Sequence, residues 1–181
     1  MIGIMRHPIS SLFDTSPSRV LPAKEYLFRT GASVAFLYQV ASGTIALRRT
    51  THVGNEITLQ VAGPGSLLAE ASLYSNEYHC DAVALETSVV TRVACSTARE
   101  VLHKSPDLAD NWAAYLARTV QKARTNSEIR SLKTVAARLD AWILFGGKLP
   151  QKGAYQDTAS ELSVTREALY RELARRKKLL V

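Results

Sequence analysis

The residues best suited to chemistry lie in the last third of the chain. Thr165 is a good helix N-cap, which places Arg166 and Glu167 in the first turn of a helix and Arg171 one turn beyond Glu167 on the same face. An arginine matches O6 and N7 of guanine, and a carboxylate accepts a hydrogen bond from N4 of cytosine. The spacing therefore predicts three side chains that read base edges in the major groove of DNA.

A surface ion pair is the alternative interpretation, because Glu167 and Arg171 stand four residues apart. The charge of the chain favours DNA: 23 Lys and Arg residues face 16 acidic ones, giving a net charge of +7. Polar and basic residues around the same helix are expected to contact phosphates. These residues are Thr165, Tyr170, Arg175, Arg176, Lys177 and Lys152.

Two short helices, over about 156–162 and 165–177, must position these side chains. Inward-facing apolar positions and a tight Ser163-Val164 turn between the helices form a helix-turn-helix pattern. The residues expected to face inward are Ala159, Leu162, Val164, Ala168 or Leu169, and Leu173. Another apolar helix precedes them, beginning at Thr134 and ended by Gly146-Gly147. Residues 134–181 are thus a helix-turn-helix DNA-binding domain.

A long helix is predicted ahead of that domain, from Ser105-Pro106 to about Ser131. Its apolar positions recur at steps of three and four and form one narrow face. They are Leu108, Trp112, Tyr115, Thr119, Ala123, Asn126 and Ile129. A narrow seam on a helix about 37 Å long favours a dimer contact. The alternative is a helix packed on its own sheet. Residues 105–133 are assigned to this dimerisation helix.

Short β-branched runs separated by turn residues extend from about Leu21 to Ala94 and are typical of an antiparallel jelly roll, to which residues 21–104 are assigned. A Ser/Pro-rich lead-in without periodicity occupies residues 1–20. Thr97, with Glu100 three residues later, predicts a capping box at the start of a short helix. The fold class is therefore α+β: a jelly roll, a long helix and a helix-turn-helix.

This order of elements resembles the bacterial cyclic-AMP-receptor/fumarate-nitrate-regulator (Crp/Fnr) family of transcription factors over residues 20–181. The matching stretches are Tyr38-Gln39-Val40-Ala41-Ser42-Gly43, Pro64-Gly65 with Glu70, Val135-Ala136-Ala137-Arg138-Leu139, and Val164-Thr165-Arg166-Glu167-Ala168-Leu169-Tyr170-Arg171. The resemblance implies a cyclic-nucleotide-binding-type domain, and a homodimer that regulates transcription from palindromic double-stranded DNA. RNA polymerase is a further candidate partner. It also implies that Arg166, Glu167 and Arg171 read a TGTGA-like half-site.

Two features depart from the family pattern around the helix-turn-helix. Ser163 stands where a turn glycine is usual, so a slightly altered turn is expected. The chain stops at Val181, where family members continue into a β-hairpin wing, so we expect the wing to be truncated. The alternative function is therefore a ligand- or protein-interaction module that binds DNA only non-specifically, with strong salt dependence.

The effector pocket implied by the resemblance is degenerate. Family members that bind cyclic nucleotides use a Phe-Gly-Glu segment for the ribose and a later Arg-Ser or Arg-Thr pair for the phosphate. The corresponding residues here are Ala69 and Glu70, then Cys80 and Asp81. A phosphate needs a cation or convergent N–H donors, which Cys80 lacks, and Asp81 would repel it. We do not expect cyclic AMP to bind, whereas a haem cofactor stays open.

Other classes of function have little support in the sequence. The four histidines show no metal-ligand spacing, and no catalytic dyad, phosphate loop or metal set is visible, so we expect no metal site and no enzyme. Cys80 could sense redox state if it were exposed and acidic, but cysteine is more often a small core residue. Two cysteines, no membrane span and no secretion signal predict a cytoplasmic protein.

Overall fold

The computed structural model describes residues 8–179 apart from Asn55, Lys148 and residues 150–154. The chain forms two compact units, Met1–Ala117 and Arg118–Val181. The first unit holds all eight strands found in the described part of the chain, and the second holds the three helices closest to the C-terminus. This division agrees with a fold class of a β jelly roll followed by helices.

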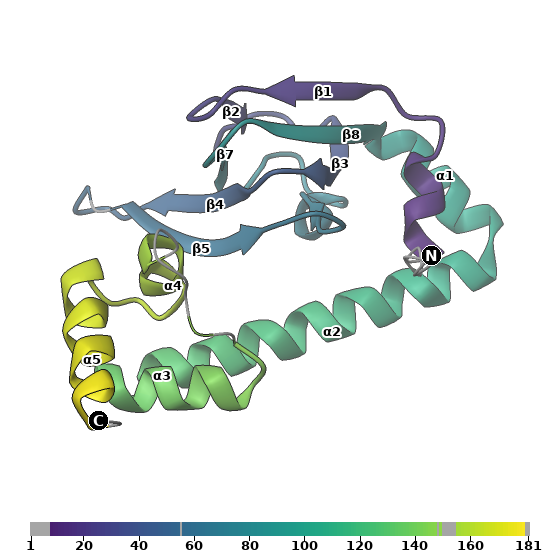
Figure 1. The fold of residues 1–181 in the computed structure, drawn as a ribbon. Coiled ribbons are helices and arrows are strands. Elements are labelled where there is room, and N and C mark those ends of the chain that lie inside the picture. The colour runs from purple at the N-terminus through teal and green to yellow at the C-terminus, as the bar shows by residue number, and fades with distance from the viewer. Residues whose placement is uncertain (1–7, 55, 148, 150–154, 180–181) are drawn as a thin grey trace, which may run out of the picture. The chain divides into compact units, whose positions relative to one another are not determined.

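The first unit is built of two four-stranded antiparallel sheets (Figure 1). One sheet has the order β1 (Ser18–Leu21), β8 (Ser88–Ala94), β3 (Phe36–Ser42) and β6 (Leu67–Leu68). The other has the order β2 (Tyr26–Phe28), β7 (Asp81–Ala84), β4 (Ile45–Thr50) and β5 (Glu56–Ala62). Apart from β4 and β5, neighbouring strands are far apart in sequence, as in β3 and β8, so long-range pairing defines the jelly roll.

Apolar side chains from both sheets meet in one core. Leu37 and Val40 of β3 and Ile45 of β4 are almost fully buried in it. A short 3₁₀-helix, η1 (Pro8–Phe13), adds Ile9 and Phe13 to the same core. The lead-in expected over residues 1–20 thus contains η1 and the start of β1, because burial of Ile9 and Phe13 stabilises regular structure in a Ser/Pro-rich segment.

Helix α1 (Cys95–Lys104) follows β8 without a loop. Its N-cap is Ala94, no side chain caps it, and the Cys95 N–H donates to the Ala35 carbonyl at 2.9 Å. The predicted capping box of Thr97 and Glu100 is therefore wrong. The helix begins earlier because it buries Cys95 together with Ala98 and Leu102.

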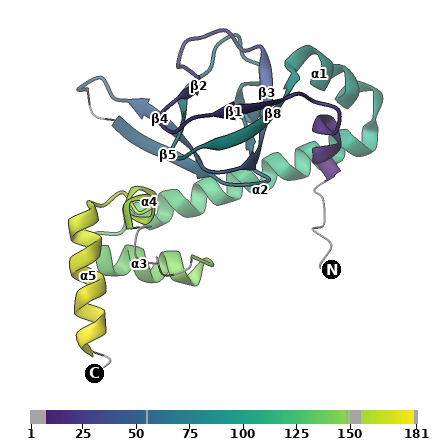
Figure 2. The same ribbon diagram turned by 45° about the horizontal axis from the view of Figure 1, so that its top comes forward.

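Helix α2 (Pro106–Ser131) begins and ends where the sequence predicts and runs unbroken (Figure 2). Several predicted seam positions are covered by their own chain. Trp112 is buried in the jelly-roll core, with Leu108 and Tyr115 packed against it. Ile129 is buried in the core of the second unit. The narrow face is thus used mostly within the chain.

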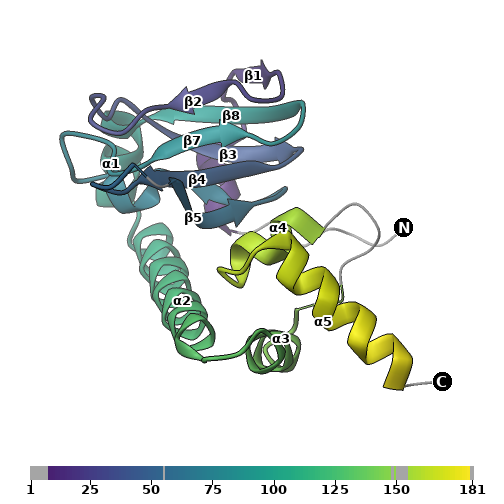
Figure 3. The same cartoon turned by 90° about the vertical axis from the view of Figure 1, so that its left-hand side faces the viewer.

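The second unit contains α3 (Val135–Leu144), α4 (Tyr155–Glu161) and α5 (Arg166–Leu179), shown in Figure 3. Thr134 caps α3 by accepting a hydrogen bond from the Ala137 N–H at 3.1 Å. The predicted stop at Gly146-Gly147 is confirmed. Gly146 has φ +93°, and the Gly147 N–H donates to the Trp142 carbonyl at 2.9 Å, which is a Schellman motif. The core joins Ile129, Leu139, Ala159, Leu162 and Leu169.

Candidate nucleic-acid interface and effector site

The turn between α4 and α5 is a second Schellman motif. Ser163 has φ +52°, its N–H donates to the Ser160 carbonyl at 3.1 Å, and the Val164 N–H donates to the Ala159 carbonyl at 2.9 Å. Serine adopts the left-handed conformation that glycine usually provides, at a cost of about 1 kcal/mol. The replacement of glycine by Ser163 therefore leaves a regular turn in place.

Packing around this turn decides one open point of the predicted core and corrects another. Leu169, and not Ala168, is the fully buried residue of α5. Val164 is half-buried and packs against the core, although burial between the helices was expected. The turn brings its backbone close to α3, so carbonyl groups as well as apolar side chains need partners there.

Arg138 of α3 supplies those partners. Its Nε donates to the Leu132 carbonyl at 2.8 Å, and its Nη1 donates to the carbonyls of Leu162 and Ser163 at 3.0 and 2.8 Å. Arg130 of α2 adds a bond from Nε to the Glu161 carbonyl at 3.1 Å. Carbonyls at helix C-termini lack intrahelical partners and favour a nearby cation. The sequence did not predict this role, although Arg138 stands between apolar positions of its helix.

The base-reading candidates lie on the exposed start of α5. Thr165 accepts a hydrogen bond from the Ala168 N–H at 3.1 Å, which confirms it as the N-cap. The side chains of Arg166 and Glu167 are 63% and 70% exposed, and only a loose 3.7 Å contact joins them. Arg171 is exposed and makes no ion pair with any described residue. The alternative pairing of Glu167 with Arg171 is thus not formed.

The residues expected to contact DNA phosphates differ in their exposure and in their partners within the chain. Tyr170 is exposed and meets Tyr155 edge to face at 6.3 Å, and Lys177 is exposed. Arg175 makes a bidentate pair with Glu172 at 2.8 and 2.9 Å but keeps more than half of its side chain exposed. Lys152 lies outside the described residues.

Arg176 is held by hydrogen bonds within the chain. It donates to Glu172 at 2.7 Å, to Asp140 at 2.6 Å and to the Ala136 carbonyl at 3.1 Å, which ties α5 to α3. Arg176 is thus bonded within the chain, because Asp140 and Ala136 lie within reach on the neighbouring helix, and the expected phosphate contact would require it to exchange these bonds.

The effector-site residues surround a short 3₁₀-helix in the jelly roll, η2 (Glu70–Ser72). Ala69 precedes it with φ +68°, so alanine here takes a left-handed conformation that glycine adopts without strain. Glu70 is only 8% exposed, and burial raises the pKa of its carboxyl group. A carboxyl group in this setting is suited to hydrogen bonding with a polar ligand and poorly suited to carrying a charge.

The two residues at the position expected for the phosphate, Cys80 and Asp81, are buried or hydrogen-bonded within the chain. Cys80 is 1% exposed, and burial raises the pKa of its thiol to about 11, so a reactive thiolate is not favoured. Asp81 accepts hydrogen bonds from the Thr30 N–H at 2.6 Å and the Thr30 hydroxyl at 3.0 Å. Arg49 of β4 donates hydrogen bonds from Nε and Nη2 to the His79 carbonyl, at 3.0 and 2.6 Å.

Metal and membrane features are not seen in the described part of the chain. It contains no group of three or more His, Cys, Asp or Glu residues that could hold a metal ion. His79 is engaged with Ser72, 3.1 Å from Nδ1 to Oγ. No described helix is long and apolar enough to cross a bilayer.

The fold and these two sites define a class of protein: a cyclic-nucleotide-binding-type jelly roll joined to a helix-turn-helix. Residues 18–105 match the cyclic nucleotide-binding domain family. The chain is 33% identical over 122 residues to the cyclic AMP receptor protein of Thermus thermophilus. That match covers 67% of this chain and 56% of the relative, so it spans little more than half of the relative's length.

Solved structures extend the likeness to the whole chain. The crystal structure of the Thermus thermophilus catabolite activator protein is 26% identical, with a TM-score of 0.58, and covers 99% of this chain and 87% of that one. FixK2 from Bradyrhizobium japonicum shares the fold, with a TM-score of 0.79 at 17% identity over 91% of this chain and 86% of that one. The chain belongs to the Crp/Fnr family.

Glu172 offers a test of the ion pairs that it forms with Arg175 and Arg176 on α5. Hydrogen bonds from Arg175 and Arg176 lower the pKa of Glu172 to about 2 from an ordinary 4.5. Its stabilising contribution is therefore complete above pH 4.5 and is lost as the pH falls towards 2. We expect Glu172→Gln to lower the free energy of unfolding at neutral pH, with a difference from the parent protein that shrinks over this range. Denaturant titrations at a series of pH values measure it.

The control is Glu128→Gln, which removes an exposed carboxylate from α2. It should change the free energy of unfolding little at any pH. A Glu172→Gln difference that stayed constant down to pH 2 would contradict the assigned ion pairs.

Proposed function

We propose that the chain is a homodimeric, sequence-specific DNA-binding transcriptional regulator. One observation carries the proposal. Arg166, Glu167 and Arg171 lie exposed on the first two turns of α5, and none of them is held in a tight ion pair with a described residue. The beginning of a recognition helix is the part that contacts base edges in helix-turn-helix proteins. The three side chains are therefore free to pair with a guanine–cytosine-containing half-site.

Phosphate contacts would surround this base-reading set. Thr165, Tyr170 and Lys177 are exposed along α5, and Arg175 could exchange its partly exposed pair with Glu172 for a phosphate. The net charge of +7 adds attraction for any duplex. We leave Arg176 out of this set, because its three partners within the chain anchor α5.

A homodimer would present two copies of α5 to a palindrome. Since Trp112 and Ile129 are buried in their own chain, we propose a seam on the adjoining face of α2. That face carries Ala113, Val120 and Ala123 at steps of seven and three, all of them exposed, and Val120 is 48% exposed. Small and β-branched residues at this spacing suit a two-helix contact.

The effector site is proposed to be altered so that it does not bind cyclic AMP. The Thermus thermophilus relative is named for cyclic AMP. In this chain, Cys80 is a neutral buried thiol, Asp81 is bound to Thr30, and Arg49 is bound to the His79 carbonyl. An incoming phosphate would meet a carboxylate and find no uncommitted cation among these groups.

Selection from a random pool of duplexes, at about 150 mM salt, tests DNA reading. We expect enrichment of a two-fold symmetric site. Arg166→Ala and Arg171→Ala should each weaken binding to that site by about 1–3 kcal/mol and relax the preference for one base, because a bidentate base contact is lost. Lys133→Ala, an exposed residue outside α5, is the matched control and should change neither quantity.

Two results would count against this function. Unchanged base preference in both arginine variants would remove the assignment of the recognition residues. An unenriched pool, with weak and steeply salt-dependent binding to any duplex, would favour the alternative of a protein- or ligand-interaction module.

The altered effector site predicts that cyclic AMP leaves the stability of the protein unchanged. A ligand present at 100 times its Kd raises the free energy of unfolding by about 2.7 kcal/mol. At about 1 mM cyclic AMP, a site with a Kd of about 10 μM would therefore give a clear shift in the unfolding midpoint. We expect no shift in a denaturant titration. A rise of that size would show that the site binds the nucleotide.

A further inference from the structure

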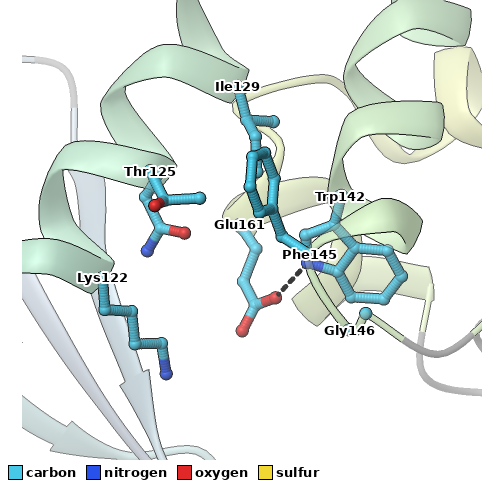
Figure 4. A pocket seen from close by; sticks show the side chains of 9 residues that line it. Lys122, Thr125, Ile129, Trp142, Phe145, Gly146 and Glu161 are labelled. Carbon is cyan, nitrogen blue, oxygen red and sulfur yellow. Dashed lines mark hydrogen bonds between the residues drawn. The ribbon is translucent and has the colours of Figure 1, made fainter. Parts of the chain in front are cut away.

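A cleft unrelated to either site lies within residues 118–181, where the end of α2 faces the end of α3 and the end of α4 (Figure 4). Its volume is about 520 Å³, within the range of about 300–1,000 Å³ common for ligand pockets. The lining residues are Lys122, Thr125, Asn126, Ile129, Trp142, Phe145, Gly146, Gly147 and Glu161. None of them belongs to the candidate base-reading set.

An aromatic wall closes one side of the cleft. The Trp142 indole donates from Nε1 to Glu161 Oε2 at 3.0 Å, which fixes the ring. Gly147 lets the backbone lie against that ring, since a Cβ there would stand 2.2 Å from Trp142 Cδ2. Phe145, at the end of α3, is 55% exposed beside it. Two rings, one of them rigidly held, offer a flat apolar surface to a ligand.

The opposite wall, on α2, is polar and unpartnered. Among the residues that the structure describes, none forms a hydrogen bond or ion pair with the side chains of Lys122, Thr125 or Asn126. Glu161 uses one carboxylate oxygen for the indole, and its Oε1 has no described partner. In Figure 4 the carboxylate extends into the space between Lys122 and Trp142.

Lys122 and Glu161 carry opposite charges but do not pair with each other, since no described contact between them falls within 4.0 Å. A ligand with one negative and one positive group could satisfy both charges at once. Lys122 lies on α2, on the side of the cleft away from Trp142, which leaves room for an apolar group against the aromatic wall. This combination is that of a free α-amino acid with an aromatic side chain.

We propose that this cleft binds a small zwitterion with an apolar ring, such as an aromatic amino acid. Its carboxylate binds Lys122, with Asn126 and Thr125 as further donors. Its ammonium group donates to Glu161 Oε1, and its ring packs on Trp142 and Phe145. Glu161 is the last residue of α4, so an occupied cleft stiffens the first helix of the helix-turn-helix. Only this regulatory consequence rests on the proposed DNA function.

Titration calorimetry of the full chain tests the site with L-phenylalanine, N-acetyl-L-phenylalanine and L-phenylalanine amide, each up to about 10 mM. The acetyl group removes the ammonium charge, and the amide removes the carboxylate. We expect saturable binding of L-phenylalanine, with each analogue at least about tenfold weaker, because each loses one charged hydrogen bond.

Two cleft variants assign the charges. Lys122→Met should weaken L-phenylalanine at least about tenfold without further weakening the amide. Glu161→Gln should do the same for L-phenylalanine without further weakening the N-acetyl analogue, and glutamine can still accept the indole N–H. Lys133→Met and Glu128→Gln, exposed residues outside the cleft, are the controls and should bind like the parent protein.

Three results would overturn the proposal: no saturable heat with L-phenylalanine, equal affinity for all three compounds, or cleft variants that bind like the controls. The outcome is independent of DNA. A chain that bound L-phenylalanine as described but enriched no duplex would contradict the proposed function and leave this site intact.

Discussion

The second unit depends on a single guanidinium group, that of Arg138. Three carbonyls converge on it, one from the α2–α3 link at Leu132 and two from the end of α4 at Leu162 and Ser163. The carbonyls of Leu132 and Leu162 are partly shielded from water, and leaving such a group without a partner costs about 1–3 kcal/mol. By binding all three, Arg138 fixes the start of the turn that sets the direction of α5. Arg166, Glu167 and Arg171 can select one DNA sequence only if the direction of α5 is fixed.

The polar side chains of the effector site in the jelly roll differ from the exposed side chains of α5. Arg166, Glu167 and Arg171 of α5 have no tight ion pair with a described residue, whereas polar side chains at the effector site are paired inside the chain. Asp81 is bound to Thr30, His79 to Ser72, and Arg49 to the His79 carbonyl. Aromatic stacking of Phe28 on Tyr78, with ring centroids 4.1 Å apart, fills the neighbouring core. The polar groups at this site thus have partners within the chain, next to a closely packed apolar core.

Features governed by neighbouring residues could be predicted from the sequence. The limits of α2, the Thr165 cap and the Gly146-Gly147 stop all follow from local backbone rules. The Thr97 capping box failed because burial of Cys95 against the sheet decided where α1 begins. Trp112 and Ile129 have the periodicity of a seam, but periodicity does not tell a partner's core from the chain's own.

Long-range polar contacts were the least predictable part of the site. In the sequence, Arg176 is one of a run of basic residues. In the structure it is bound by Asp140, thirty-six residues away. Arg138 lies in a stretch shared with the family, but its three carbonyl partners come together only in the folded unit. Sequence alone identifies such residues as charged and helical. Their partners depend on packing that no local pattern encodes.

The most direct test of this account is the affinity of Arg138→Leu for the selected duplex, measured at a temperature where circular dichroism shows the variant to be folded. If the guanidinium aims α5, binding to the selected site falls by at least about tenfold, while weak binding to random duplexes stays. Arg124→Leu, which removes an exposed charge from α2, should keep the preference. An Arg138→Leu variant with unchanged affinity and unchanged base preference would show that the turn needs no such anchor.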